Sequence, residues 1–168
     1  MRRITYRRAG PEDAEQLLEY LKTVGGETDN LTFGSQGIPF TLEQERSFLE
    51  KSRNDLYNHI ILALDGDRIV GDCSISGSRN ARLCHRREIG ISVLREYWGM
   101  GIGSEFMRQL IDFARKNGVE QISLSVRADN ERAKALYRKF NFISCGTIPG
   151  YIKVNGLRYD VEFMCLEL

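Results

Sequence analysis

The spacing of apolar residues predicts one strand and two helices in the first third of the chain. Apolar and polar side chains alternate from Arg2 to Arg8, which is the two-residue period of a strand. Pro11 suits the start of a helix in which leucines recur at helical spacing, and we expect Gly25–Gly26 to end it. Thr41 opens a second, shorter helix. The loop between these helices is rich in glycine and polar residues but also carries large apolar side chains, so we expect it to pack partly against the core.

From His59 onward the pattern predicts strands that alternate with single helices. The expected strands are His59–Gly66, Arg68–Ser78, about Arg82–Val93, Gln121–Ala128, Asn141–Val154 and Leu157–Leu168, and the expected helices are Ser104–Lys116 and Asn130 to about Phe140. The full order is therefore β-α-α-β-β-β-α-β-α-β-β.

This order predicts an α/β fold with a mixed, mostly antiparallel sheet. The strand, helix and strand from Ile89 to Val126 imply one parallel pairing through a right-handed crossover, and hairpins flank it. A single domain over residues 1–168 is expected, with about six to seven strands and about four helices.

Composition and charge exclude several classes of partner. Lys and Arg total 24 and Asp and Glu total 23, and a net charge of +1 provides no broad attraction to nucleic acid or to an anionic membrane. The basic start lacks the apolar run of a signal peptide, and no stretch approaches the roughly 20 apolar residues of a membrane span, so we expect a cytoplasmic protein. The four cysteines include no CxxC pair, which argues against a metal site or a disulfide.

Three alternating glycines mark a turn between a strand and a helix. Gly99, Gly101 and Gly103 remove side chains from backbone that must approach a ligand closely, and the following helix points its free N–H groups at that ligand. A diphosphate is the natural occupant of such a turn. No Lys follows these glycines, as a P-loop requires, and Phe106 stands where a dinucleotide fingerprint needs its third glycine. The turn therefore indicates another diphosphate-containing ligand.

This turn and the segment after the next strand resemble the two consecutive motifs of the GNAT acetyltransferases. The family patterns Q/R-x-x-G-x-G/A and N-x-x-A-x-x-L-Y-x-K-x-G-F correspond to Trp98–Gly103 and Asn130–Phe142. Trp98 replaces the usual Gln or Arg, at a position that contributes mainly a backbone N–H in the family. Asn141 replaces the usual Gly, and asparagine tolerates left-handed backbone. The ending Asp160–Leu168 resembles the bacterial branch that includes ribosomal-protein N-terminal acetyltransferases and small-amine acetylators.

The resemblance implies the acyl-CoA N-acyltransferase fold, acetyl-CoA as co-substrate, no metal, and direct attack by a primary amine. Tyr137 would be the acid that protonates the leaving sulfur, and Asn130 would touch the pantetheine or order its helix. The implied cofactor-binding residues lie on the strand before the turn, in the turn and on the later helix: Ile91, Ser92, Val93, Trp98, Gly99, Met100, Gly101, Ile102, Gly103, Ser104, Asn130, Ala133 and Tyr137.

The proton acceptor and the amine acceptor are less closely defined. Glu88 resembles the carboxylate that many family members use to take the amine proton, and we favour it over His85; alternatively, Glu88 only binds the acceptor. The acceptor would be a protein or peptide N-terminus, an amino acid or a small amine. The residues expected to bind it are in the first loop and the closing hairpin: Glu27, Asp29, Asn30 and Tyr151.

Two further alternatives concern activity and assembly. A non-catalytic acyl-CoA sensor would keep the glycine turn and lose the acid, so the presence of Tyr137 favours an enzyme. Neither the length of the acyl chain nor the oligomeric state follows from the sequence. An exposed strand edge is expected near Leu157–Leu168, where a second copy would pair in a homodimer.

Overall fold

A mixed seven-stranded sheet organises residues 3–168, which the computed structural model describes. The strands lie in the order β1-β2-β3-β4-β5-β7-β6. Their bounds are β1 Ile4–Arg8, β2 His59–Asp65, β3 Arg68–Ser76, β4 Arg86–Val93, β5 Gln121–Arg127, β6 Ile143–Val154 and β7 Leu157–Glu167. The helices are α1 Ala14–Glu27, α2 Leu42–Ser52, α3 Ile102–Lys116 and α4 Glu131–Lys139. The predicted order of elements is confirmed; Arg2, where the first strand was expected to begin, lies outside the described residues.

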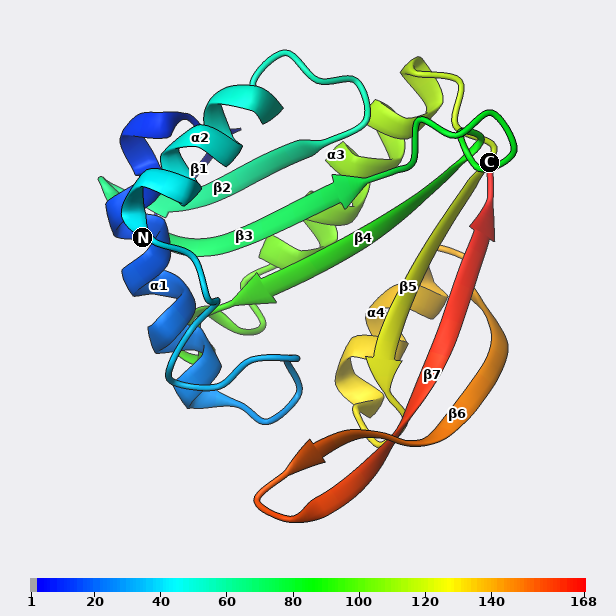
Figure 1. The fold of residues 1–168 in the computed structure, drawn as a ribbon. Helices are drawn as coiled ribbons and strands as arrows, with labels where there is room; N and C mark the ends of the chain where they lie inside the picture. Colours follow the sequence, from blue (N-terminus) through cyan, green and yellow to red (C-terminus); the bar gives the residue numbers. More distant parts are fainter. Residues whose placement is uncertain (1–2) are drawn as a thin grey trace.

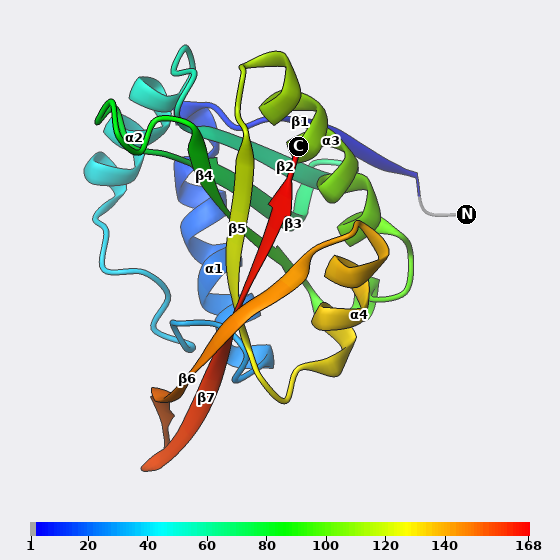
Figure 2. The same ribbon diagram turned by 90° about the vertical axis from the view of Figure 1, so that its right-hand side faces the viewer.

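Helices cover both faces of the sheet. Helices α1 and α2 lie on one face, which we call the α1/α2 face, and α3 and α4 lie on the opposite α3/α4 face (Figures 1 and 2). Strand β2 is buried almost from end to end, because helices cover it on both sides. No helix among residues 3–168 is both long and apolar enough to cross a bilayer.

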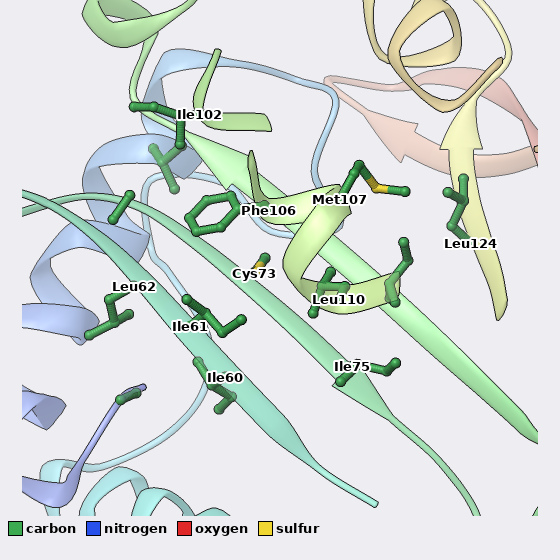
Figure 3. Close-up of a cluster of buried hydrophobic side chains, with 14 of the residues drawn as sticks. Ile60, Ile61, Leu62, Cys73, Ile75, Ile102, Phe106, Met107, Leu110 and Leu124 are labelled. Atoms are coloured by element: carbon green, nitrogen blue, oxygen red, sulfur yellow. The ribbon is translucent and has the colours of Figure 1, made fainter. Parts of the chain in front are cut away.

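The largest part of the core lies between α3 and the central strands. Phe106 and Leu110 are fully buried on the inner side of α3, and they point toward Cys73 and Ile75 of β3 (Figure 3). Tyr6 of β1 meets the ring of Phe106 edge to face, with 5.7 Å between the ring centroids. This packing fixes α3, and with it the glycine turn at its first residues, against β3 and β4.

Strands β4 and β5 pair in parallel over a short stretch and then separate. The paired residues are Arg86 with Gln121, Arg87 with Ile122, and Glu88 with Ser123. Beyond Glu88 the two strands diverge (Figure 1), so the second half of β4 has no neighbouring strand on its β5 side. The expected parallel pair is present, and its early end opens the sheet near the glycine turn.

Helix α1 runs through the two glycines that were expected to end it and stops at Glu27. A Cβ atom added at Gly25 would lie 2.2 Å from the carbonyl oxygen of Gly34, in the loop that follows the helix. The glycine therefore permits a close approach of this loop and does not terminate the helix. The loop packs partly against the core, through Leu31, Phe33 and Ile38, as expected.

The expected free edge at Leu157–Leu168 is wrong. Strand β7 lies inside the sheet, because it pairs with β5 on one side and with β6 on the other. The outer strand is β6, Ile143–Val154, whose pairing with β7 shifts register between Ser144 and Gly146. Any pairing with a second copy at this end of the sheet would use β6.

Candidate active site

A cavity of about 440 Å³ opens where β4 and β5 separate. Its walls are the end of β4, the glycine turn, the start of α3, helix α4 and part of the loop after α1. Every residue predicted to bind the cofactor lines this cavity except Met100, which is exposed. The two sequence motifs therefore meet on one site, although β5 separates them in the chain.

The glycine turn presents bare backbone to this cavity. Gly99 and Gly101 have φ values of +82° and +84°, which favour glycine, and a Cβ atom at either would meet nothing within 4 Å. Gly101 caps α3 without a side-chain hydrogen bond, so the first N–H groups of the helix remain available to a ligand. Free N–H groups at a helix start, with open space before them, suit an anion such as a diphosphate.

Trp98 ties the turn to β4 and supports a cation at the cavity. Its indole N–H donates a hydrogen bond of 2.8 Å to the carbonyl oxygen of Val93. The guanidinium of Arg132 lies over its ring, 4.5 Å from the centroid, and Arg95 lies 5.6 Å from the same ring. Where the GNAT pattern has Gln or Arg, this chain thus has an aromatic ring that makes a cation–π contact with Arg132 of α4.

Two cations at the cavity were missed from the sequence. Arg132 and Lys139, both on α4, line it together with the glycine turn. A signal was present, because both lie inside the second motif and Lys139 is one of its matching positions. They give the site a local positive charge in a chain whose net charge is only +1.

Helix α4 positions the candidate acid. The Asn130 side chain accepts a hydrogen bond of 3.2 Å from the N–H of Ala133 and so caps the helix. Tyr137 is only 8% exposed, and burial raises the pKa of its phenol to about 12. The phenol therefore keeps its proton throughout the neutral range. Asn141 follows with a φ of +66°, the left-handed conformation expected where it replaces glycine.

The structure separates Glu88 from Tyr137. Glu88 is exposed on the α1/α2 face, opposite Ser76 of β3 and Ser123 of β5. With these serines it lines a second cavity of about 470 Å³, at the end of β4 where the sheet is still closed. His85 lines neither of these cavities, and its carbonyl oxygen accepts backbone hydrogen bonds from Glu120 and Gln121.

The residues expected to bind the acceptor are dispersed. Asn30 lines the main cavity, whereas the Glu27 carboxylate accepts a hydrogen bond of 2.7 Å from the backbone N–H of Arg95. The carbonyl oxygen of Asp29 accepts a hydrogen bond of 3.0 Å from Arg127. Tyr151 is 55% exposed on β6 and does not line the main cavity. Glu27 and Asp29 thus hold the loop in place, and Asn30 alone of the four faces the site.

A polar cluster beside the main cavity was also missed. The hydroxyl of Ser92, which lines the cavity, donates a short hydrogen bond to the carboxylate of Asp72, and Tyr20 Oη lies 2.7 Å from Ser92 Oγ. Burial raises the pKa of Asp72 to about 6, although hydrogen bonds from Ser92 and Tyr20 act in the opposite direction. No local pattern marks this cluster, because Tyr20 and Ser92 are 72 positions apart in the chain.

Comparisons with known proteins agree with this geometry. The chain is 38% identical to the N-alpha-acetyltransferase RimI of Mycobacterium tuberculosis, over 60% of this chain and 61% of that protein. It is 31% identical to the L-amino acid N-acetyltransferase AaaT of Escherichia coli, over 62% of this chain and 65% of that protein. The matches therefore span less than two thirds of either relative.

Similarity to a solved structure extends over the whole chain. The crystal structure of a GNAT-family acetyltransferase from Streptococcus pneumoniae superposes with a TM-score of 0.95 at 28% identity, and covers 99% of this chain and 100% of that one. The model of the acetyltransferase (GNAT) family matches residues 27–142, which include both motifs and most of the main cavity. The protein belongs to the GNAT family of acetyltransferases.

Proposed function

We propose that residues 1–168 form one catalytic domain that transfers an acetyl group from acetyl-CoA to a primary amine. One observation carries this proposal: the open backbone of the glycine turn and the buried phenol of Tyr137 line the same cavity. GNAT acetyltransferases use acetyl-CoA, which supplies an acetyl group activated as a thioester. No group of three or more His, Cys, Asp and Glu residues in 3–168 has the geometry of a metal site.

The residues present fit coenzyme A. The N–H groups at Gly101–Ser104 and the cations Arg132 and Lys139 would hold the diphosphate. The pantetheine would lie along Ile91–Val93, where β4 has no neighbouring strand on its β5 side and its backbone can still form hydrogen bonds there. Asn30 and Ala133 would close the sides of the same cavity.

We assign the roles of Tyr137 and Glu88 from their positions in the two cavities. Tyr137 would donate its proton to the sulfur as the carbon–sulfur bond breaks, since its phenol remains protonated at neutral pH. Of the two roles open to Glu88, we propose acceptor binding, because this carboxylate lies in the second cavity, away from Tyr137. The Glu88 carboxylate would pair there with the ammonium group of the acceptor, beside Arg86 and Arg87, which line the same cavity.

An α-amino group is the acceptor that we favour. The two relatives are named as enzymes that acetylate α-amino groups and L-amino acids. An α-amine with a pKa of about 7.7 is roughly one-third neutral at pH 7.4, whereas a lysine amine is neutral in only about one molecule in a thousand. A weak base therefore suffices for an α-amine.

The proposal is tested by thiol release from acetyl-CoA with a panel of L-amino acids, N-terminal peptides and polyamines. We expect turnover with α-amines, and at least a tenfold lower kcat in Tyr137→Phe. Tyr151→Phe is the matched control, because Tyr151 lies outside the main cavity. Tight acetyl-CoA binding without turnover on any amine would favour the sensor alternative, and full activity of Tyr137→Phe would remove Tyr137 from the acid role.

A further inference from the structure

The α1/α2 face of β3 and β4 is polar next to the main cavity. Asp72 and Ser92 are directly paired across the two strands, and both point to this face, where Tyr20 of α1 meets Ser92. The neighbouring residues Cys73 and Ile91 point to the opposite, apolar face, as strand alternation requires. The polar cluster is therefore placed on the side of the sheet from which α1 and α2 approach.

A second carboxylate faces this cluster from α2. Glu45 is only 2% exposed, and its Oε2 atom has no hydrogen-bond partner. Burial, and then the charge of Asp72, raise the pKa of the Glu45 carboxyl. No Arg, Lys or His of residues 3–168 forms an ion pair with Asp72 or Glu45. A carboxylate as deeply buried as Glu45 is normally paired, so Glu45 beside Asp72 is suited to a positively charged ligand.

Gly90 lies on this face between Ser92 and the second cavity. Gly90 of β4 is exposed on the same face, between Glu88 and Ser92, and its partner on β3 is Ser74. Gly90 has no side chain that would obstruct an amine moving along β4 from Glu88 to Ser92. Asp72 itself is partly exposed, so a proton placed on it can be passed to solvent.

We propose that Asp72 receives the proton of the bound acceptor ammonium through the hydroxyl of Ser92, while Glu45 stabilises the positive charge of that ammonium. This inference rests on the proposed acetyltransferase function and assigns its proton acceptor. Ser92 Oγ would accept a proton from the ammonium nitrogen and pass its own along the existing hydrogen bond to Asp72. The nitrogen then has the lone pair that attack on the thioester requires.

Bonds and protons are conserved in the remaining steps. The nitrogen forms a bond to the acetyl carbon, and the carbon–sulfur bond breaks. A second proton leaves the nitrogen after attack and replaces the one that Tyr137 gives to the sulfur. The products are the amide and the free thiol, and Asp72 returns its proton to solvent.

The surroundings of Asp72 suit this task. The groups that face it are Tyr20 of α1, Glu45 of α2 and Ser92 of β4, and none is a cation. With a pKa of about 6, Asp72 is ionised at pH 7.4 and is still basic enough to accept a proton from an α-ammonium group.

The test compares Asp72→Asn with Asp67→Asn, an exposed carboxylate in the turn between β2 and β3. The assay measures kcat and KM from pH 5 to 9, with acetyl-CoA and the best amine of the panel. We expect Asp72→Asn to lower kcat about 100-fold at pH 7. The decrease in kcat that the wild type shows below about pH 6 should be absent from the pH profile of the variant. Its kcat should rise again at high pH, where the amine loses its proton without a base. Binding of acetyl-CoA should not change. Glu45→Gln should raise the acceptor KM more than it lowers kcat.

The outcomes separate the two proposals. A folded Asp72→Asn variant with wild-type kcat at pH 7, or with the same fractional loss at every pH, would overturn the role of Asp72 and leave the acetyltransferase function intact. Absence of wild-type turnover with every amine would overturn both. Thermal unfolding of each variant shows whether a loss of activity reflects a loss of structure.

Discussion

Arg132 of α4 lies over the indole ring of Trp98, with its guanidinium carbon 4.5 Å from the ring centroid, and both residues line the main cavity. The contact joins the two GNAT motifs directly, across the place where the diphosphate would bind. The tryptophan at the position of the usual Gln or Arg therefore has a clear consequence, since it fixes a cation that another helix supplies.

We expect Trp98→Ala to weaken acetyl-CoA binding roughly tenfold, measured by calorimetry. The variant loses the contact with Arg132, worth about 0.5–1 kcal/mol, and the hydrogen bond to Val93, worth about 0.5–1.5 kcal/mol. Trp98→Phe keeps an aromatic ring and loses the N–H donor, so it should have an intermediate affinity. An unchanged dissociation constant in Trp98→Ala would show that the ring has no part in binding.

Gly101→Ala should lose both stability and acetyl-CoA binding. Its φ of +84° is strained for alanine by about 1–2 kcal/mol, and the new methyl group would enter the space in front of α3. Gly118→Ala is the matched control, because Gly118 has a φ of +66°, equally open surroundings and no place in the main cavity. Both variants should melt at a lower temperature, but only Gly101→Ala should bind acetyl-CoA less tightly. Equal affinities in the two variants would contradict the diphosphate site.

Asp72→Asn should make the protein more stable above pH 6. The folded-state pKa of Asp72 is about 6, against an ordinary value of 3.8, so the native state prefers the protonated acid. The native state is therefore penalised as the pH rises from about 4 through 6, by up to ~3 kcal/mol when fully developed. Urea unfolding at pH 5 and pH 8 measures this difference. Identical pH dependence in the wild type and Asp72→Asn would contradict it.

His59 should make the native state less stable as the pH falls, which is the opposite of the effect expected of Asp72. It stacks on Phe113 with 4.3 Å between ring centroids, and burial, with a smaller effect of Arg8, lowers its pKa from 6.5 to about 4. The unfolded chain binds this proton more readily, so stability should fall as the pH decreases from about 6.5 toward 4. His59→Phe keeps a stacked ring and should be less sensitive over that range, measured by thermal unfolding. Equal sensitivity would place the acid-labile group elsewhere.

The sequence predicted those parts of the fold and the site that depend on local spacing. Two-residue and helical periods predicted the order of elements, and the motifs around Gly101 and Tyr137 predicted residues that share one cavity. The position of β7 inside the sheet was missed, because it depends on which arm of the last hairpin pairs with β5. The contact between Gly25 and Gly34 was likewise missed, because it depends on how the loop packs against α1.

The polar cluster shows most clearly why the rest could not be predicted. Asp72 appears in the sequence as one polar residue in an otherwise alternating strand, which suggests a solvent-facing position. Its partners come from α1, α2 and β4, and their meeting depends on how both helices pack on the sheet. Burial, which gives this carboxylate its unusual proton affinity, results from the assembled fold.

The short pairing of β4 with β5 also has a consequence for the protein in solution. Only three residue pairs join these strands, so a molecule that binds along Ile91–Val93 fills a gap in the hydrogen bonding of the sheet itself. Binding and folding are then linked, and acetyl-CoA at 100 times its dissociation constant would add about 2.7 kcal/mol to the stability of the native state. The stability of the native state would accordingly rise with the concentration of acetyl-CoA.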